Sequence, residues 1–182
     1  MIEAVPRPDE SPGAARIARV FSEHADFVWR SLRRLGVPAA DVDDALQEVF
    51  LVVHRRIGEY EDRGLMRAWL FSISRQVSSH YHRGVKRSEE RHRGVLVSAV
   101  PRDPEEAFAR RQAERFVNGF LDELDEPRRL VFFLADIEGL TAPEIAAALS
   151  VNLNTIYGRL RQARARFEAA LARRTGEGST SP

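Results

Sequence analysis

Apolar residues recur at steps of three and four along most of this chain, and this spacing predicts amphipathic helices. The first half is predicted to contain three long helices, over about 14–35, 41–57 and 65–87. The second half is predicted to contain four more, over about 104–124, 127–137, 142–149 and 153–173. No run of alternating apolar and polar residues is flanked by hairpin turn residues. The predicted fold class is therefore all-α.

The segment between these two groups of helices has no clear apolar period. It contains Pro101 and Pro104 among mixed residues, which is typical of a linker. The sequence thus predicts two small helical domains joined by a flexible linker, with an extension before the first and a disordered tail after the second. The predicted bounds are 1–13 for the extension, 14–92 for the first domain, 93–106 for the linker, 107–174 for the second domain and 175–182 for the tail.

The second domain is predicted to have four helices, and its last two carry the clearest local motif. Thr141 and Glu144 fit a capping box at a helix start, and Asn152 fits the cap of the next helix after a short turn. On that next helix one apolar arc can anchor to the core, formed by Ile156, Leu160, Ala163 and Phe167. Two helices joined by so short a turn predict a helix-turn-helix.

The arc opposite this apolar one is predicted to face DNA. Arg and Asn side chains on a recognition helix can pair with base edges in the major groove, while flanking Arg side chains contact phosphates. The residues predicted to bind duplex DNA are Asn154, Thr155, Tyr157, Gly158, Arg159, Arg161, Gln162 and Arg164. A solvated basic helix packed on its neighbours is the alternative interpretation of the same pattern.

Charge is distributed unevenly, although the formal net charge is only +1. Residues 67–93 contain seven Lys or Arg against two acidic residues, and residues 152–174 contain six Arg against one. The stretches 41–48 and 122–126 are acidic instead. Basic helices suit a polyanion, whereas the acidic stretches suit a different partner. The charge pattern therefore indicates two kinds of partner.

Other classes of function are disfavoured. The chain has no cysteine, which excludes a disulfide framework and a thiolate zinc site. His80 and His82 lie two apart on a predicted helix and so cannot share one ion. No phosphate loop, nucleophile elbow or paired-carboxylate motif occurs. We expect no metal, no cofactor and no catalytic residue. The acidic start and the lack of a long apolar run also predict no secretion and no membrane insertion.

Both halves of the chain resemble, in order, the extracytoplasmic-function (ECF) group of the sigma-70 family, over about 14–174. The second half is similar to region 4 through Glu138-Gly139-Leu140, Glu144-Ile145-Ala146, Thr155-Ile156, Arg159-Leu160 and Ala163-Arg164. The first half is similar to region 2 through Asp44-Ala45-Leu46-Gln47-Glu48-Val49-Phe50, and through Trp69-Leu70 followed by Arg75. The resemblance implies a sigma factor, which directs core RNA polymerase to specific promoters and promotes DNA melting.

The resemblance also implies partners and roles for particular residues. Region 4 would bind the minus-thirty-five element as duplex. Region 2 would bind the minus-ten element as single strand, through Tyr60, Arg63, Arg67, Arg75, Gln76, His80 and Arg83. It would contact the polymerase through Asp44, Gln47, Glu48 and Leu51. The implied partners are core RNA polymerase (its beta-prime clamp helices and beta flap), promoter DNA and an anti-sigma factor, in the cytoplasm with the nucleoid.

Four positions, at three sites, depart from the family pattern. Gln76 stands where Asn is usual, Met66 replaces a usual aromatic, and Tyr157-Gly158 stands where a basic residue and Ser are common. We interpret these departures as altered promoter preference with activity retained.

Trp69 is predicted to be a core residue because it lies on an apolar arc. A free-standing helix-turn-helix regulator that binds duplex without polymerase remains an alternative, although it would leave the acidic 44–50 surface unexplained.

Overall fold

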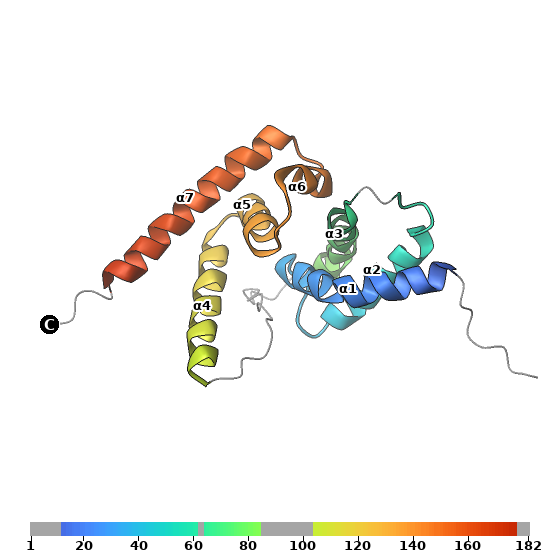
Figure 1. Cartoon of the computed structure of the whole chain (residues 1–182), viewed down its shortest axis with the longest axis horizontal. Coiled ribbons are helices and arrows are strands. Elements are labelled where there is room, and N and C mark those ends of the chain that lie inside the picture. Colours follow the sequence, from blue (N-terminus) through green and yellow to red (C-terminus); the bar gives the residue numbers. More distant parts are fainter. Residues whose placement is uncertain (1–11, 62–63, 85–103, 178–182) are drawn as a thin grey trace, which may run out of the picture. The chain divides into compact units, whose positions relative to one another are not determined.

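The computed structural model describes residues 12–61, 64–84 and 104–177, and the regular elements within these ranges are all helical (Figure 1). The prediction of an all-α fold is therefore confirmed. The chain divides into two compact units, residues 1–87 and 88–182. Most of the predicted linker, 93–103, lies outside the described residues, as do the extension up to residue 11 and the last five residues of the predicted tail.

The first unit contains three helices that pack on one another, α1 (Pro12–Arg34), α2 (Val42–Arg56) and α3 (Met66–Gly84). Its buried core includes Phe27, Val28, Leu32, Val49, Val53, Leu70, Phe71 and Ile73. Gly36 ends α1 with a positive φ of 96°, which a residue without a β-carbon adopts at little cost. The Val37 N–H then donates to the Leu32 carbonyl at 3.0 Å, so the chain turns directly towards α2.

The second unit contains α4 (Pro104–Glu123), α5 (Glu126–Phe132), a π-helical turn η1 (Phe133–Ile137), α6 (Ala142–Leu149) and α7 (Leu153–Glu177). Aromatic rings from three of its helices form the centre of its core. The Phe120 ring centroid lies 5.2 Å from that of Phe132 and 5.1 Å from that of Phe167. Phe116 lies 5.9 Å from Phe167. This cluster fixes the middle of α7 against α4 and α5.

Helix α4 begins at Pro104, as predicted, because proline is favourable in the first turn of a helix, and its first residues therefore overlap the predicted linker. Two other helix bounds in this unit differ from the sequence prediction. Helix α7 continues through Glu177, into the predicted tail, where the Thr175 hydroxyl donates to the carbonyls of Leu171 and Ala172. The single helix predicted over 127–137 ends at Phe132 and continues as η1, in which the Glu138 N–H donates to the Phe133 carbonyl at 3.0 Å.

The start of α6 carries the predicted capping box. Glu144 Oε2 accepts hydrogen bonds from the Thr141 N–H and from the Thr141 hydroxyl, both at 2.6 Å. The carboxylate thus satisfies a backbone donor that the helix itself leaves unpaired. This local prediction from the sequence is confirmed.

A Glu144→Ala variant is expected to lower the free energy of unfolding by about 1 kcal/mol, because that backbone donor loses its partner. The change is measured by urea unfolding followed by circular dichroism. Glu168→Ala is the matched control, since Glu168 is exposed in the middle of α7, where it caps no helix start. Equal stability of Glu144→Ala and the parent protein would contradict a stabilising cap.

Candidate nucleic-acid and polymerase interfaces

The turn between α6 and α7 is short and fixed by backbone and side-chain hydrogen bonds. Ser150 adopts a left-handed conformation, with φ 55° and ψ 45°. The Val151 N–H donates to the Ala146 carbonyl at 3.0 Å. Asn152 Oδ1 then accepts from the Asn154 N–H at 2.8 Å, which confirms the predicted cap. The predicted helix-turn-helix is therefore present.

Helix α7 is amphipathic in its first four turns. Ile156 and Ala163 are fully buried, Leu160 is 7% exposed, and Phe167 is half-buried against the aromatic cluster. The opposite arc is open to solvent. Of the eight residues predicted to bind duplex DNA, Gly158 and Arg159 are half-buried, and the other six are exposed: Asn154, Thr155, Tyr157, Arg161, Gln162 and Arg164. The packing of α7 thus leaves the predicted readout arc accessible.

Two long-range contacts tie α7 to the rest of the unit on opposite flanks of this arc. Arg128 of α5 donates from Nε to Gln162 Oε1 at 2.7 Å, and its guanidinium also pairs with the Asp125 carboxylate. Arg164 pairs with Asp136 of η1, with Nε 3.0 Å and Nη2 2.9 Å from Oδ1. Because residues two apart on a helix are separated by about 200°, the two contacts hold α7 from both sides.

Sequence reasoning missed Arg128, Asp125 and Asp136. The partners of the two contacts are separated by 34 and 28 residues, so no local pattern pointed to them. Two of the predicted DNA contacts, Gln162 and Arg164, therefore also have partners within the unit. The DNA contact of Arg164 stays a prediction, and it would compete with the carboxylate of Asp136.

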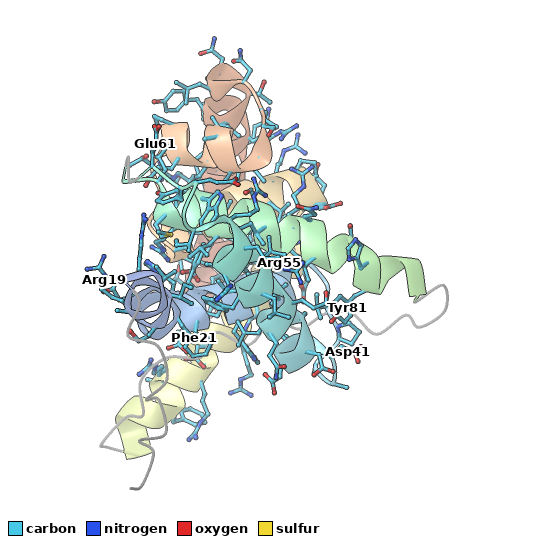
Figure 2. The ribbon with its side chains drawn as sticks, turned by 90° about the vertical axis from the view of Figure 1, so that its right-hand side faces the viewer. Arg19, Phe21, Asp41, Arg55, Glu61 and Tyr81 are labelled. Carbon is cyan, nitrogen blue, oxygen red and sulfur yellow. The ribbon has the colours of Figure 1, made fainter. Side chains whose placement is uncertain are left out.

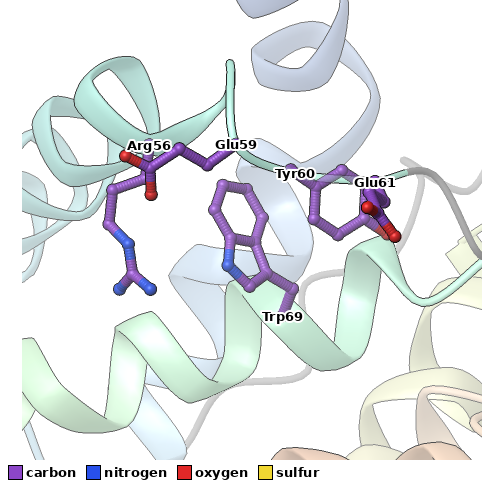
Figure 3. Close-up of a pocket in the computed structure, with 5 residues that line it drawn as sticks. All are labelled: Arg56, Glu59, Tyr60, Glu61 and Trp69. Carbon is purple, nitrogen blue, oxygen red and sulfur yellow. The ribbon is translucent and has the colours of Figure 1, made fainter.

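In the first unit, a pocket of about 430 Å³ lies beside the start of α3, lined by Arg56, Glu59, Tyr60, Glu61 and Trp69 (Figure 3). The Tyr60 and Trp69 ring centroids are 4.8 Å apart, with 32° between the ring planes. From α1, Arg16 donates to the Tyr60 carbonyl at 3.2 Å, and its guanidinium carbon lies 6.0 Å from the Tyr60 ring. Tyr60 is thus held in place from two elements.

The position of Trp69 differs from the sequence prediction. Its neighbours Leu70 and Ile73 are buried, but Trp69 itself is half-buried and lines the pocket. Position 69 lies at the edge of the apolar arc of α3. One face of the Trp69 ring is covered by the Tyr60 ring and not by core residues. The prediction that Trp69 belongs to the core is wrong to that extent.

The other residues predicted to bind the minus-ten element have different environments. Arg75, Gln76 and His80 are exposed on α3. The guanidinium carbon of Arg67 lies 4.4 Å from the Phe27 ring centroid, so Arg67 makes a cation–π contact with α1. Arg63 and the side chain of Arg83 lie outside the described residues. The structure therefore brings an aromatic pocket and an exposed polar face of α3 together in one unit.

The four residues predicted to contact polymerase are all exposed on one face of α2: Asp44, Gln47, Glu48 and Leu51. Leu51 is 56% exposed. Burial raises the pKa of Tyr81 on α3, and the nearby carboxylates of Glu48, Asp44 and Asp41 raise it further. Figure 2 shows Asp41 and Tyr81 close together. The acidic face of α2 thus continues onto a tyrosine of α3, which the sequence analysis did not include.

Within the described ranges, no helix has the length and apolar content needed to cross a membrane. The same residues contain no group of three or more His, Asp or Glu side chains placed to hold a metal ion.

Comparisons with known proteins agree with this architecture. The family models for sigma-70 region 2 and sigma-70 region 4 match residues 20–88 and 119–167. The RNA polymerase sigma factor NccH of Alcaligenes xylosoxydans xylosoxydans is 29% identical over 163 residues, which cover 84% of this chain and 85% of that protein. The ECF RNA polymerase sigma factor SigE of Mycolicibacterium smegmatis is 29% identical over 169 residues, which cover 87% of this chain and 63% of that protein.

Solved structures give the same result. The structure of CnrH, a sigma factor of Cupriavidus metallidurans, in complex with the cytosolic domain of CnrY matches with a TM-score of 0.62 and 27% identity. That match covers 87% of this chain and 89% of CnrH. Three findings agree: two family models match in the expected order, relatives match along most of the chain, and the fold matches a solved sigma factor. The chain belongs to the extracytoplasmic-function group of the sigma-70 family, and it is an RNA polymerase sigma factor that directs transcription from specific promoters.

Proposed function

We propose that this sigma factor uses its two units on two promoter elements, the minus-thirty-five element as duplex and the minus-ten element as single strand. The observation that carries this proposal is the amphipathicity of α7, which buries Ile156 and Ala163 and leaves Asn154 and Arg161 in solvent. A helix after a helix-turn-helix turn presents such an arc to the major groove. Arg and Asn side chains pair there with base edges.

The minus-ten element would bind along α3 and its pocket. Unpaired bases stack on aromatic side chains, and Tyr60 and Trp69 line a pocket of about 430 Å³. Exposed Arg75, Gln76 and His80 supply charge and hydrogen bonds for the strand. Binding of the open strand would favour melting, because a protein that binds only unpaired DNA shifts the equilibrium towards it.

Core polymerase would bind the α2 face through its beta-prime clamp helices, and region 4 through its beta flap. The α2 face combines exposed acids with the exposed apolar Leu51, which suits a protein partner more than DNA. An anti-sigma factor is a further proposed partner, since CnrH is bound in its solved structure to the cytosolic domain of CnrY, an anti-sigma factor. The proposed location is the cytoplasm, with polymerase at the nucleoid, and the proposed activity includes no catalysis by this chain.

The proposal is tested by mixing the full chain with sigma-free polymerase and genomic promoter fragments, and then mapping the transcript starts. Starts that depend on both promoter elements support it. Duplex binding without polymerase retention would instead favour a free-standing regulator. Permanganate reactivity of thymines near the start site reports melting separately.

Glu48→Ala is expected to weaken retention of the protein on core polymerase by roughly three- to tenfold, because an exposed charge at the edge of an interface contributes modestly. Retention is measured by co-elution with core polymerase, and binding to upstream duplex is measured in parallel. Asp26→Ala is the matched control, since Asp26 is exposed on α1 and the change in charge is the same. Loss of duplex binding in Glu48→Ala would contradict the assignment of this face to polymerase.

A further inference from the structure

Gln162, on the readout arc of α7, has its amide oriented by a chain of two side chains. The Asp125 carboxylate pairs with the Arg128 guanidinium, and it also accepts from the Arg128 N–H at 3.2 Å. Arg128 Nε then donates to Gln162 Oε1 at 2.7 Å. Asp125 is the N-cap of α5, so this series of hydrogen-bonded side chains starts from a fixed backbone position.

The chemistry of these groups determines which way the amide faces. An arginine side chain has five N–H donors and no acceptor, so only the oxygen of Gln162 can meet it. The amide oxygen is therefore directed to the flank of α7, towards α5. The amide nitrogen, with its two donors, remains for a partner outside the unit. Gln162 is exposed, so such a partner can reach it.

This orientation limits which base Gln162 can read. A glutamine reads adenine through two bonds, in which its oxygen accepts from N6 and its nitrogen donates to N7. We infer that Arg128 is a specificity-determining residue, which makes Gln162 a hydrogen-bond donor for an acceptor edge, guanine O6 and N7 or thymine O4, and disfavours adenine. The inference rests on the proposed function, in which α7 lies in the major groove of the upstream element.

The position of α7 does not depend on Arg128 alone. Ile156 and Ala163 are fully buried, and Arg164 holds Asp136 on the other flank. Removal of the Arg128 guanidinium should therefore free the Gln162 amide to rotate without shifting the helix. A rotated amide can offer both its oxygen and its nitrogen to adenine.

The test uses the full chain with core polymerase and a promoter library in which every base pair of the upstream element is varied singly. Arg128→Met keeps the aliphatic stem of the side chain and removes its donors. In this variant the preference for adenine over guanine or thymine should rise by roughly fivefold or more at one base pair. Arg128→Lys, which keeps a donor, should retain the parent preference in part. Arg115→Met is the control for charge, because Arg115 is exposed on α4.

Two further variants make the test independent of how well Arg128→Met folds. Gln162→Ala should flatten the preference at the same base pair and abolish the effect of Arg128→Met in the double variant. Gln162→Glu keeps a partner for Arg128 but removes the outward donors, so the preference for an acceptor edge should disappear.

Uniform weakening across all sequences in Arg128→Met would overturn the inference, because it indicates a phosphate contact. An unchanged preference at every base pair would also overturn it, while upstream-dependent transcription by the parent protein would leave the proposed function standing. Absence of any upstream dependence in the parent protein would overturn both.

Discussion

Arg161→Ala is expected to lose most of the affinity for the upstream promoter element, by roughly 5- to 150-fold, the range for one arginine bonded to a base edge. Arg161 is exposed near the centre of the readout arc. Among the residues that the structure describes, it has no ion-pair partner, whereas Arg164 is paired with Asp136. Its guanidinium can therefore bind DNA without first breaking a contact inside the protein. The measurement is the binding of the polymerase complex to promoter duplexes with intact and scrambled upstream elements.

Arg173→Ala provides the control, because Arg173 is exposed on the same helix, three turns beyond Arg161, and the change in charge is identical. We expect it to leave the preference for the intact element unchanged. If both variants lost affinity equally, Arg161 would act through general charge, and its assignment to base recognition would be wrong.

Phe120→Ala is expected to destabilise the second unit by about 3–5 kcal/mol, because it removes a buried ring and leaves a cavity. Phe120 is 4% exposed and contacts both Phe132 and Phe167, so the substitution loosens α4, α5 and α7 together. A loss of this size is a large part of the stability of a small unit. Thermal unfolding followed by circular dichroism should show part of the helical signal lost at lower temperature.

The chain contains its own control for this experiment. Its two tryptophans, Trp29 and Trp69, both belong to the first unit, so tryptophan fluorescence follows that unit alone. In Phe120→Ala, the midpoint temperature of the fluorescence transition should be the same as in the parent protein. Phe108→Ala is the matched substitution, since Phe108 is 59% exposed on α4 and should change stability by less than about 0.5 kcal/mol. Equal melting of Phe120→Ala and Phe108→Ala would contradict the role of the aromatic cluster.

The parts of the fold that depend on neighbours in sequence could be predicted. The capping of α6 by Glu144 and the cap of α7 by Asn152 are local hydrogen bonds, formed between residues two or three apart. The apolar arc of α7 follows from helical periodicity alone, and with it the exposure of Asn154 and Arg161. The fold class and the exposure of the readout arc could therefore be predicted from the sequence.

The contacts that orient the site depend on tertiary structure and could not be predicted. Nothing near Gln162 in the sequence indicates that Arg128 will reach it from α5, and nothing indicates the wider turn of η1 that carries Asp136 to Arg164. Trp69 was misplaced for a related reason. Periodicity assigns a residue to a face of its helix, but the loop residue Tyr60 determines what covers that face.

The two faces of α7 have a consequence for how this protein can change over time. The positions that pack on the core and those proposed to contact bases alternate along one continuous helix, so their spacing around the helix is rigidly linked. One residue added or lost between Ile156 and Phe167 would rotate everything after it by about 100°, carrying arginine inward and phenylalanine into water. On the proposed function, promoter choice can therefore evolve by exchange of single outward side chains, whereas the length of this stretch cannot vary.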